Sequence, residues 1–334
     1  MLTILRYDYV RDMPDTAWPG GEGLSARHFE GQLDHIQRYY TICTPEQVLA
    51  ATHAEGDPLP DNACLLTFDG GLRDHYVTVL PRLLARQVTG CFFPIVAAAE
   101  NRWVLIVHKV QHLLAAPVDR EKLFQDLLRG IDAWREAYEL PPTQSLLAAC
   151  ASGVVGYNDF RLRQFKCLLQ HVLPRQAAWA IAGELFRKHV TADEAGFAEG
   201  LYLTTDELRE MVGLGMGVGG HGVRHDSMEH LSRHGQREKM LRSREYLAQI
   251  LGEPPSAWIM NYPYGSHDAR TVELARAVPG CRLAVTNCPG VVENFSQPYQ
   301  LPRLHSHNLP KTADAPPCAW TRMTLAASAR EQAA

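Results

Sequence analysis

The sequence lacks any run of about 20 apolar residues, so it offers no candidate for a membrane-spanning helix. Its N-terminal apolar stretch is short, because Arg6, Asp8 and Arg11 interrupt it. A signal peptide needs a longer apolar region followed by a cleavage site of small residues, and neither is present. We therefore expect the N-terminus to be the first strand of the fold and the protein to stay in the cytoplasm.

Paired cysteines and an excess of positive charge are also missing. The eight cysteines are scattered and form no CxxC pair, which favours free thiols in a reducing compartment over a disulfide framework or a zinc ribbon. The formal net charge of −4 argues against a general nucleic-acid binder. Neither observation indicates an oligomeric state, and we predict none.

What is present is the composition of a globular protein with a large core. Hydrophobic residues make up 46% and charged residues 21% of the 334 residues. Apolar runs at Ala63–Phe68 and Cys91–Val96, with helical periodicity at His75–Gln87 between them, predict a βαβ unit. Such a unit favours an α/β fold with a parallel sheet. Later apolar runs predict further strands at Met216–Gly220, Ala257–Asn261 and Arg282–Thr286.

The strand rhythm is interrupted between about Val104 and Phe197, where the periodicity is mostly helical. At this length, two domains and one barrel-type domain with an insertion are both ordinary. We interpret the region 104–197 as a helical insertion in a single domain of residues 1–310, because long insertions at surface loops cost little. Residues 311–334 are rich in Ala, Pro and Thr and are predicted to form a peripheral tail.

A carboxylate follows the first buried strand of the βαβ unit. Asp69 lies in the motif TFDGG, where two glycines come directly after it. In α/β barrels the catalytic groups collect at this edge of the sheet. The alternative is that Asp69 only caps the following turn or helix, and for the motif taken alone that alternative is the better interpretation.

Two more motifs also follow predicted strands. In HGVRH, His221 and His225 face the same way if the segment begins a helix, and imidazoles at that spacing commonly bind a divalent metal. The chain has 15 histidines, so a chance pair is the competing interpretation. In NYPYG, the rigid turn around Tyr264 can present backbone N–H groups or can be a plain loop.

The order of the motifs is more specific than any one of them. TFDGG, HGVRH, YPYG and then Leu301-Pro302-Arg303-Leu304 resemble the polysaccharide deacetylase family, also called the NodB-homology or carbohydrate esterase family 4 group. The resemblance extends from roughly Leu2 to Pro310. It implies a distorted (β/α) barrel that binds a divalent metal, usually zinc, and removes acetyl groups from N-acetylated sugars.

The resemblance also implies a role for each matching residue. Asp69 corresponds to the general base, and His221 and His225 correspond to metal ligands. The turn at Tyr264 would supply a backbone donor to the oxyanion on the substrate side of the site. Arg303 belongs to the same side, where it can orient Asp69.

The chain departs from the family pattern at Gly70. The usual motif is TFDDG, and its second Asp binds the metal, so one ligand is missing here. Asp8 follows the first strand and can supply the lost carboxylate, or can simply pair with Arg6 or Arg11. Asn261 stands where many members keep an arginine, which makes Arg303 the expected support of the base.

A second departure is the pair His305 and His307, where relatives often have acidic residues. The two side chains alternate as on an extended segment and so face one side. His305 is our candidate for the general acid that protonates the leaving amine, and His307 is a further possible metal ligand. Two surface histidines in a loop are an equally good interpretation.

Three functional hypotheses follow. The first is a metal-dependent hydrolase that removes an acyl group from an N-acylated sugar, either a small molecule or a lipid-linked precursor. The second is a metal-independent amide or imide hydrolase on the same fold, which the missing ligand at Gly70 favours. The third is a catalytically degenerate protein that binds sugar or acts as a scaffold by assembling with a partner. The fold alone cannot choose among them.

Overall fold

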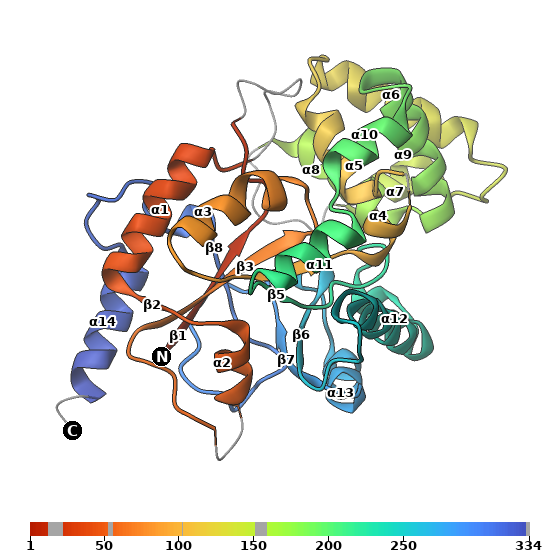
Figure 1. Cartoon of the computed structure of the whole chain (residues 1–334). Coiled ribbons are helices and arrows are strands. Elements are labelled where there is room, and N and C mark those ends of the chain that lie inside the picture. Colours follow the sequence, from red (N-terminus) through yellow and green to blue (C-terminus); the bar gives the residue numbers. More distant parts are fainter. Residues whose placement is uncertain (13–22, 53–55, 102, 151–158, 332–334) are drawn as a thin grey trace. The chain divides into compact units, whose positions relative to one another are not determined.

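The computed structural model describes residues 1–12, 23–52, 56–101, 103–150 and 159–331. Contacts between residues divide the chain into two compact units (Figure 1). The sheet unit contains Met1–Asp12, Gly23–Asn101 and Leu201–Ala334, and the helical unit lies within Arg102–Gly200. The helical unit spans nearly the same residues as the helical region expected at 104–197.

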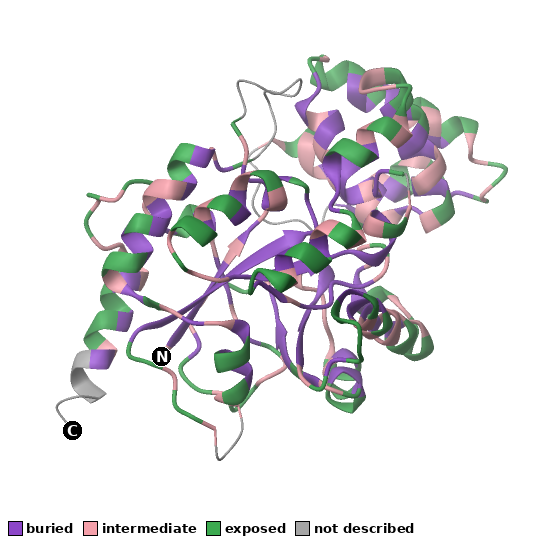
Figure 2. Cartoon of the chain, in the orientation of Figure 1, coloured by how far each residue is buried: buried purple, intermediate pink, exposed green. Residues whose placement is uncertain are grey.

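The sheet unit is built on a parallel sheet with the strand order β5-β4-β3-β1-β8, and β2 also pairs with β3. All eight residues of β3 are buried, as expected for a continuous apolar run that is covered on both faces (Figure 2). The strands of this sheet are β1 (Leu2–Tyr7), β2 (Thr41–Ile42), β3 (Ala63–Gly70), β4 (Cys91–Pro94), β5 (Gly217–Val218) and β8 (Leu304–His305).

A second, two-stranded sheet pairs β6 (Trp258–Asn261) with β7 (Cys281–Val285) in parallel. Isolated bridges from Gly220 to Met260 and from Val285 to Leu301 connect it with the larger sheet. Among the described residues the strands close into no regular barrel. The predicted α/β class and distorted barrel type are confirmed, with two sheets in place of a closed ring.

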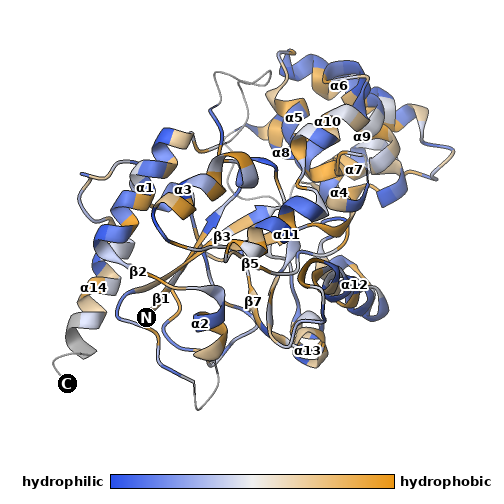
Figure 3. Cartoon of the chain, viewed as in Figure 1, coloured by the Kyte–Doolittle hydropathy of each residue, from blue (hydrophilic) through white to orange (hydrophobic). Residues whose placement is uncertain are grey.

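Helices of the sheet unit begin at the caps that the sequence supplies. The Ser25 hydroxyl accepts a hydrogen bond from the His28 N–H at the start of α1, and Thr44 and Gln47 form a capping box at α2. In Figure 3 the helices α1, α11 and α12 show hydrophilic residues among hydrophobic ones. Their bounds are α1 (Ala26–Tyr39), α2 (Pro45–Ala50), α3 (Leu80–Ala85), α4 (Val96–Glu100), α11 (Thr205–Gly213), α12 (Arg233–Leu251), α13 (Ala269–Ala277) and α14 (Ala319–Glu331).

Short turns of other helix types complete this unit. The helical segment predicted at His75–Gln87 consists of a π-helical turn, η2 (His75–Val79), followed directly by α3. Pro81 lies in the first turn of α3, where its missing N–H is tolerated. The remaining turns are η4 (Met228–His230), η5 (Pro263–Gly265) and η6 (Ser306–Asn308).

The C-terminal segment beyond Pro310 contains α14, which runs beside α1 (Figure 1). The Tyr40 hydroxyl at the end of α1 donates a hydrogen bond to the Thr321 hydroxyl at 3.0 Å, and Thr321 and Thr324 are buried. In the described part of the chain, no helix combines the length and the apolar character that crossing a bilayer requires. All eight cysteines fall in described regions and are free thiols.

The helical unit has its own hydrophobic core, which includes Phe124, Leu127 and Ile181. Its elements are α5 (Ile106–Ala115), α6 (Arg120–Ala133), α7 (Thr143–Ala149), α8 (Phe160–Cys167), η3 (Leu168–Val172), α9 (Arg175–His189) and most of α10 (Glu194–Leu201). Two buried charged residues, Lys109 and Asp126, tie these helices together. Lys109 of α5 contacts Glu194 of α10 at 2.8 Å, and Asp126 of α6 binds Lys188 and His189 of α9 at 2.8 and 2.7 Å.

Asp126→Ala is expected to destabilise the helical unit by about 2 kcal/mol. The substitution removes the buried carboxylate of α6 that contacts Lys188 and His189 of α9. Burial raises the pKa of Asp126, but Lys188, Arg129 and His189 outweigh that effect and hold the pKa below its ordinary value. The stabilisation is therefore present above the unfolded-state pKa of about 4 and is lost as the pH falls through the lower folded-state pKa.

Urea unfolding measures the difference, and hydrogen exchange should show faster exchange confined to α6 and α9. Asp132→Ala is the matched control, because Asp132 is an exposed carboxylate on the same helix whose pair with Arg135 is worth little. Equal stability of the Asp126→Ala and Asp132→Ala proteins at pH 7 would contradict the prediction.

Candidate functional site

Asp69 lies at the carboxyl end of β3 and is buried. Both of its carboxylate oxygens accept hydrogen bonds from Arg303, each at 2.8 Å, which makes the pair bidentate. Burial by itself raises the pKa of the Asp69 carboxyl, but the guanidinium of Arg303 outweighs burial and the pKa lies below its ordinary value. Asp69 is therefore an ionised carboxylate with a fixed orientation near neutral pH.

Arg303 is itself held on every side. Its Nε donates to the Thr286 carbonyl at 2.9 Å. Its Nη atoms donate, besides Asp69, to the side-chain oxygens of Thr67, Asn261 and Asn287. A guanidinium has five N–H donors, and these acceptors account for all of them. The geometry therefore matches the orienting role predicted for Arg303 and leaves it no N–H for an oxyanion.

His221 and His225 come together, but not through a helix. The segment that contains them is a turn without helical structure. Gly222 and His225 have φ values of 72° and 58°, the left-handed region that glycine adopts without strain and other residues rarely enter. The two imidazole rings lie 4.9 Å apart between centroids. A turn, and not the start of a helix, therefore brings the two rings together.

The protonation of His221 follows from its surroundings. Its Nδ1 lies 3.0 Å from the Asn261 carbonyl oxygen. A carbonyl can only accept, so Nδ1 carries the hydrogen and Nε2 keeps a lone pair. Burial lowers the pKa of His221 and outweighs the opposing influence of Asp69 and of the carbonyl. His221 is therefore a neutral imidazole near pH 7.

The third motif joins the second at η5. Tyr264 lies at φ 59° and ψ 4°, and its ring stacks edge-on against His225 at 4.3 Å between centroids. The following Gly265 is required, because a Cβ there would come within 2.6 Å of the Asn287 backbone nitrogen. The turn is thus closely packed against Asn287 and His225. A backbone contact from Tyr264 to an oxyanion remains a prediction.

Asp8 belongs to a different cluster on the same edge of the sheet. Its carboxylate binds Arg6 at 2.8 Å and the Nε2 of His305 at 3.0 Å. Burial raises the pKa of Asp8, but Arg6 and His305 outweigh burial, and the pKa lies well below its ordinary value. Arg6 also approaches Asp69 at 3.8 Å. The ring of His307 lies beside that of His305, 4.1 Å away between centroids.

The residues do not make up a complete zinc site. Catalytic zinc usually has three protein ligands. Within the described ranges, no group of three or more His, Cys, Asp or Glu side chains is placed to hold a metal ion. His221 and His225 provide two nitrogens, whereas Asp8, the proposed third ligand, faces Arg6 and His305. We therefore derive no reaction step that requires a metal, and metal binding by this chain stays a prediction.

Two residues of the site were not singled out as functional by the motifs. Asn287 accepts from Arg303 at 2.9 Å, and it comes directly after the strand predicted at Arg282–Thr286. The rule that active residues follow strand ends would therefore have found it. Arg6, treated only as a partner of Asp8, also approaches Asp69. No sequence signal marks that second contact, because it joins residues on two different strands.

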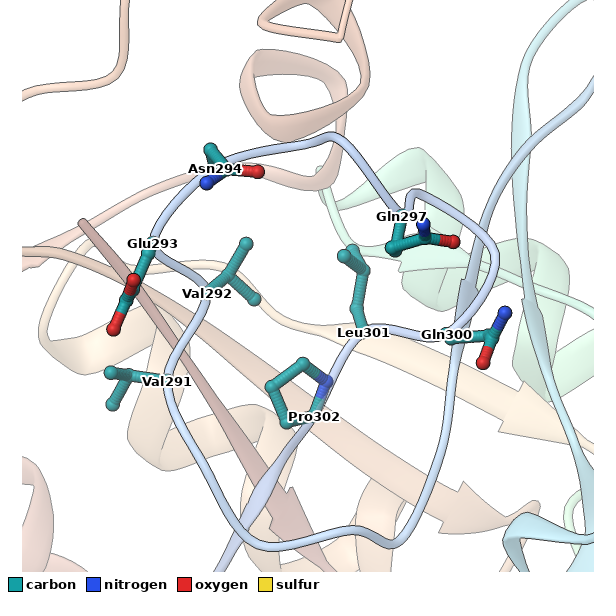
Figure 4. Close-up of a pocket in the computed structure, with 8 residues that line it drawn as sticks. All are labelled: Val291, Val292, Glu293, Asn294, Gln297, Gln300, Leu301 and Pro302. Atoms are coloured by element: carbon teal, nitrogen blue, oxygen red, sulfur yellow. The ribbon is translucent and has the colours of Figure 1, made fainter.

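A small pocket of about 190 Å³ lies elsewhere in the sheet unit (Figure 4). Val292 of its lining bridges Leu2 at the amino end of β1, whereas Asp8 and Asp69 lie at the carboxyl ends of their strands. The pocket shares none of the predicted site residues. Its lining residues are Val291, Val292, Glu293, Asn294, Gln297, Gln300, Leu301 and Pro302.

Sequence comparison finds the predicted family in part of the chain. Residues 170–279 match the sequence model described as polysaccharide deacetylase. Over this segment the chain is similar to the polysaccharide deacetylase family. The segment includes His221, His225 and Tyr264 but neither Asp69 nor Arg303. No curated protein sequence matches the chain.

Solved structures extend the likeness in fold to most of the chain. The deacetylase PplD of Streptococcus pyogenes has a TM-score of 0.56 at 17% identity, covering 91% of both chains. IcaB from Ammonifex degensii has a TM-score of 0.54 at 18% identity, covering 98% of this chain and 97% of its own. A de-N-acetylase from Aggregatibacter actinomycetemcomitans has a TM-score of 0.51 at 15% identity, covering 91% and 94%. At these identities the likeness shows the fold alone, and the predicted fold type is confirmed, whereas the predicted family is supported by the match over residues 170–279.

Arg303→Lys is expected to lower kcat/KM by about 100-fold. A lysine cannot bind both oxygens of Asp69 in the bidentate geometry, and a displacement of a catalytic carboxylate by about 1 Å can lower the rate by about 100-fold. The substitution keeps one positive charge beside the carboxylate, so the protein should still fold. Released acetate, measured with an acetylated amino-sugar oligomer, reports the change.

Arg282→Lys is the control for this substitution, since Arg282 is an exposed residue on β7. A kcat/KM for Arg303→Lys within threefold of the wild-type value would show that the bidentate contact is not needed.

Proposed function

We propose that the chain is a hydrolase that removes an acyl group, acetyl in the first instance, from the nitrogen of an N-acylated sugar. The family match and the fold support a hydrolase that acts on an amide C–N bond. The observation that carries the proposal is the buried, ionised Asp69, held by Arg303 at a sheet edge that also carries the Asp8–His305 pair. The S. pyogenes deacetylase was solved in complex with acetate, which suggests the acetyl group as the first one to test.

The side chains supply two proton-transfer groups for this reaction. Asp69 accepts a proton from the attacking water, as a carboxylate near a reacting water can do. The Nε2–H of His305 donates its proton to the leaving amine, and the proton that Asp69 took from the water returns to Nε2, so that both groups end the reaction as they began it. The rigid turn at Tyr264 supports a backbone donor for the oxyanion, a contact that is usually worth several kcal/mol in such reactions.

The substrate and the site of action are proposed on chemical grounds. The family match supports a sugar substrate, either a small molecule or a lipid-linked precursor. Eight free cysteines are compatible with a reducing compartment, which supports the cytoplasm. The net charge of −4 gives no support for a nucleic-acid partner.

The second candidate function is a metal-independent amide hydrolase on the same fold. Gly70 has no side chain to bind a metal, and the carboxylates at this edge, Asp69 and Asp8, are already paired with arginines. In this hypothesis the neutral His221 and the ionised Asp69 catalyse amide hydrolysis without a metal. A scaffold that only binds sugar is the third reading, and it predicts binding without turnover.

Asp69→Asn is expected to lower the turnover of an N-acetylglucosamine oligomer by at least about 100-fold, because the amide cannot accept the proton of water and general-base catalysis is worth about 10²–10⁴-fold. Released acetate and the newly formed free amine are both measured. Asp34→Asn is the matched control, since Asp34 is an exposed carboxylate that pairs with Arg86. Turnover by Asp69→Asn within threefold of the wild type would rule out Asp69 as the base.

Zinc binding is expected to be weaker than at a three-ligand site, because the described residues bring His221 and His225 together without a third His, Cys, Asp or Glu placed to complete the group. Calorimetric titration of the purified protein with zinc should show binding that His221→Ala abolishes. His234→Ala is the control, since this histidine lies on α12, outside the site. Zinc binding that survives His221→Ala would contradict this assignment, and turnover that survives chelation would favour the metal-independent reading.

A further inference from the structure

The ring of His305 is held by the helical turn that follows it. The backbone N–H of His307 donates to Nδ1 of His305 at 3.2 Å. The backbone N–H of His305 donates in return to the side-chain oxygen of Asn308 at 2.9 Å. These two contacts form a capping box at η6 (Ser306–Asn308). The orientation of the His305 ring therefore depends on the position of η6.

The same contacts fix which nitrogen of His305 carries the proton. Because Nδ1 accepts from a backbone N–H, it must keep its lone pair. In the neutral ring the hydrogen is then on Nε2, which faces the Asp8 carboxylate at 3.0 Å. A displaced η6 would release Nδ1 and allow the other tautomer. The proton that the proposed acid donates is thus placed by contacts made at the opposite side of the ring.

The side chain of Gln32 of α1 is hydrogen-bonded to the backbone of η6. Its amide nitrogen donates to the carbonyls of Ser306 at 2.6 Å and Leu309 at 3.2 Å, one at each end of the turn. Both carbonyls can only accept, so the amide must present its nitrogen, and its two N–H groups match the two carbonyls. Gln32 is fully buried. A buried hydrogen bond of this kind cannot be replaced by water without rearrangement.

The neighbouring Gly31 shows how closely α1 fits this part of the chain. A Cβ at Gly31 would come within 2.5 Å of the Lys311 carbonyl oxygen. The backbone that follows η6 therefore lies directly on α1, and η6 has little room to shift while Gln32 is in place.

We propose that Gln32 is a positioning residue for His305. It fixes η6, and η6 fixes the ring orientation and the tautomer of His305, so that Nε2–H is held against Asp8. The inference rests on the proposed function only in its claim that this proton is used in the reaction. The structural part, that Gln32 sets the tautomer of His305, stands independently of any substrate.

The test compares Gln32→Met with the wild-type full-length protein. Methionine has nearly the same length and volume but donates no hydrogen bond, so packing is kept and only the two contacts are lost. Long-range ¹H–¹⁵N NMR of the histidine rings reports the tautomer, and His305→Gln assigns the His305 signal. We expect a single Nε2–H form in the wild type and a mixture in Gln32→Met.

Turnover of an N-acetylglucosamine oligomer should follow the tautomer. We expect kcat of Gln32→Met to fall by about tenfold with KM close to the wild-type value, because proton donation is impaired and substrate binding is not. Asn308→Ala loosens η6 from its exposed side and should give the same NMR and kinetic changes, which covers the case in which Gln32→Met folds poorly. Tyr40→Phe is the matched control, since it removes another buried hydrogen bond next to α1, the one to Thr321.

The outcomes are separable. A wild-type His305 signal and a wild-type kcat in both Gln32→Met and Asn308→Ala would overturn the proposal, as would equal losses in Tyr40→Phe. If the wild type turns over no acetylated sugar, the proposed function fails, while the NMR comparison still decides the role of Gln32. A changed tautomer with unchanged kcat would overturn the catalytic part alone.

Discussion

The buried pair of Arg303 and Asp69 is the interaction on which the site depends. A carboxylate at the end of a fully buried strand can stay ionised without a large cost in folding free energy only if it is paired and hydrogen-bonded. Arg303 supplies both, and the oxygens of Asn261 and Asn287 in turn satisfy Arg303. One guanidinium therefore joins the ends of β3, β6 and β7, and the two sheets meet at this edge through a polar network in addition to two bridges.

Asn261 connects the Asp69–Arg303 pair with His221. Its side-chain oxygen accepts from Arg303, and its backbone carbonyl accepts from His221. The position of the base and the tautomer of the histidine are thus set by one residue at the end of β6. A single strand can do this because its carbonyl and its side chain point in different directions.

The pairing of the carboxylates with arginines bears on whether this edge of the sheet can bind a metal cation. Asp69 and Asp8 each lie beside an arginine, and a cation already present lowers the attraction of the site for another one. His221 and His225 lie 4.9 Å apart between ring centroids, but among the described residues no third His, Cys, Asp or Glu completes a metal-binding group with them. The electrostatics of the edge thus differ from those that a family pattern with two adjacent aspartates would produce.

The sequence by itself determined the class of fold and the identity of most of the site. Apolar runs ending in Asp69, in the histidine motif and in the Tyr264 turn predicted strands whose ends meet at one edge, because parallel strands carry their C-terminal loops on the same side. Only the tertiary structure decided which side chains contact each other across separate elements. Asp8 meets His305, Arg6 lies between two carboxylates, and Gln32 reaches η6 from α1. These contacts join residues that are far apart in the chain, and no local pattern encodes a distance between separate elements.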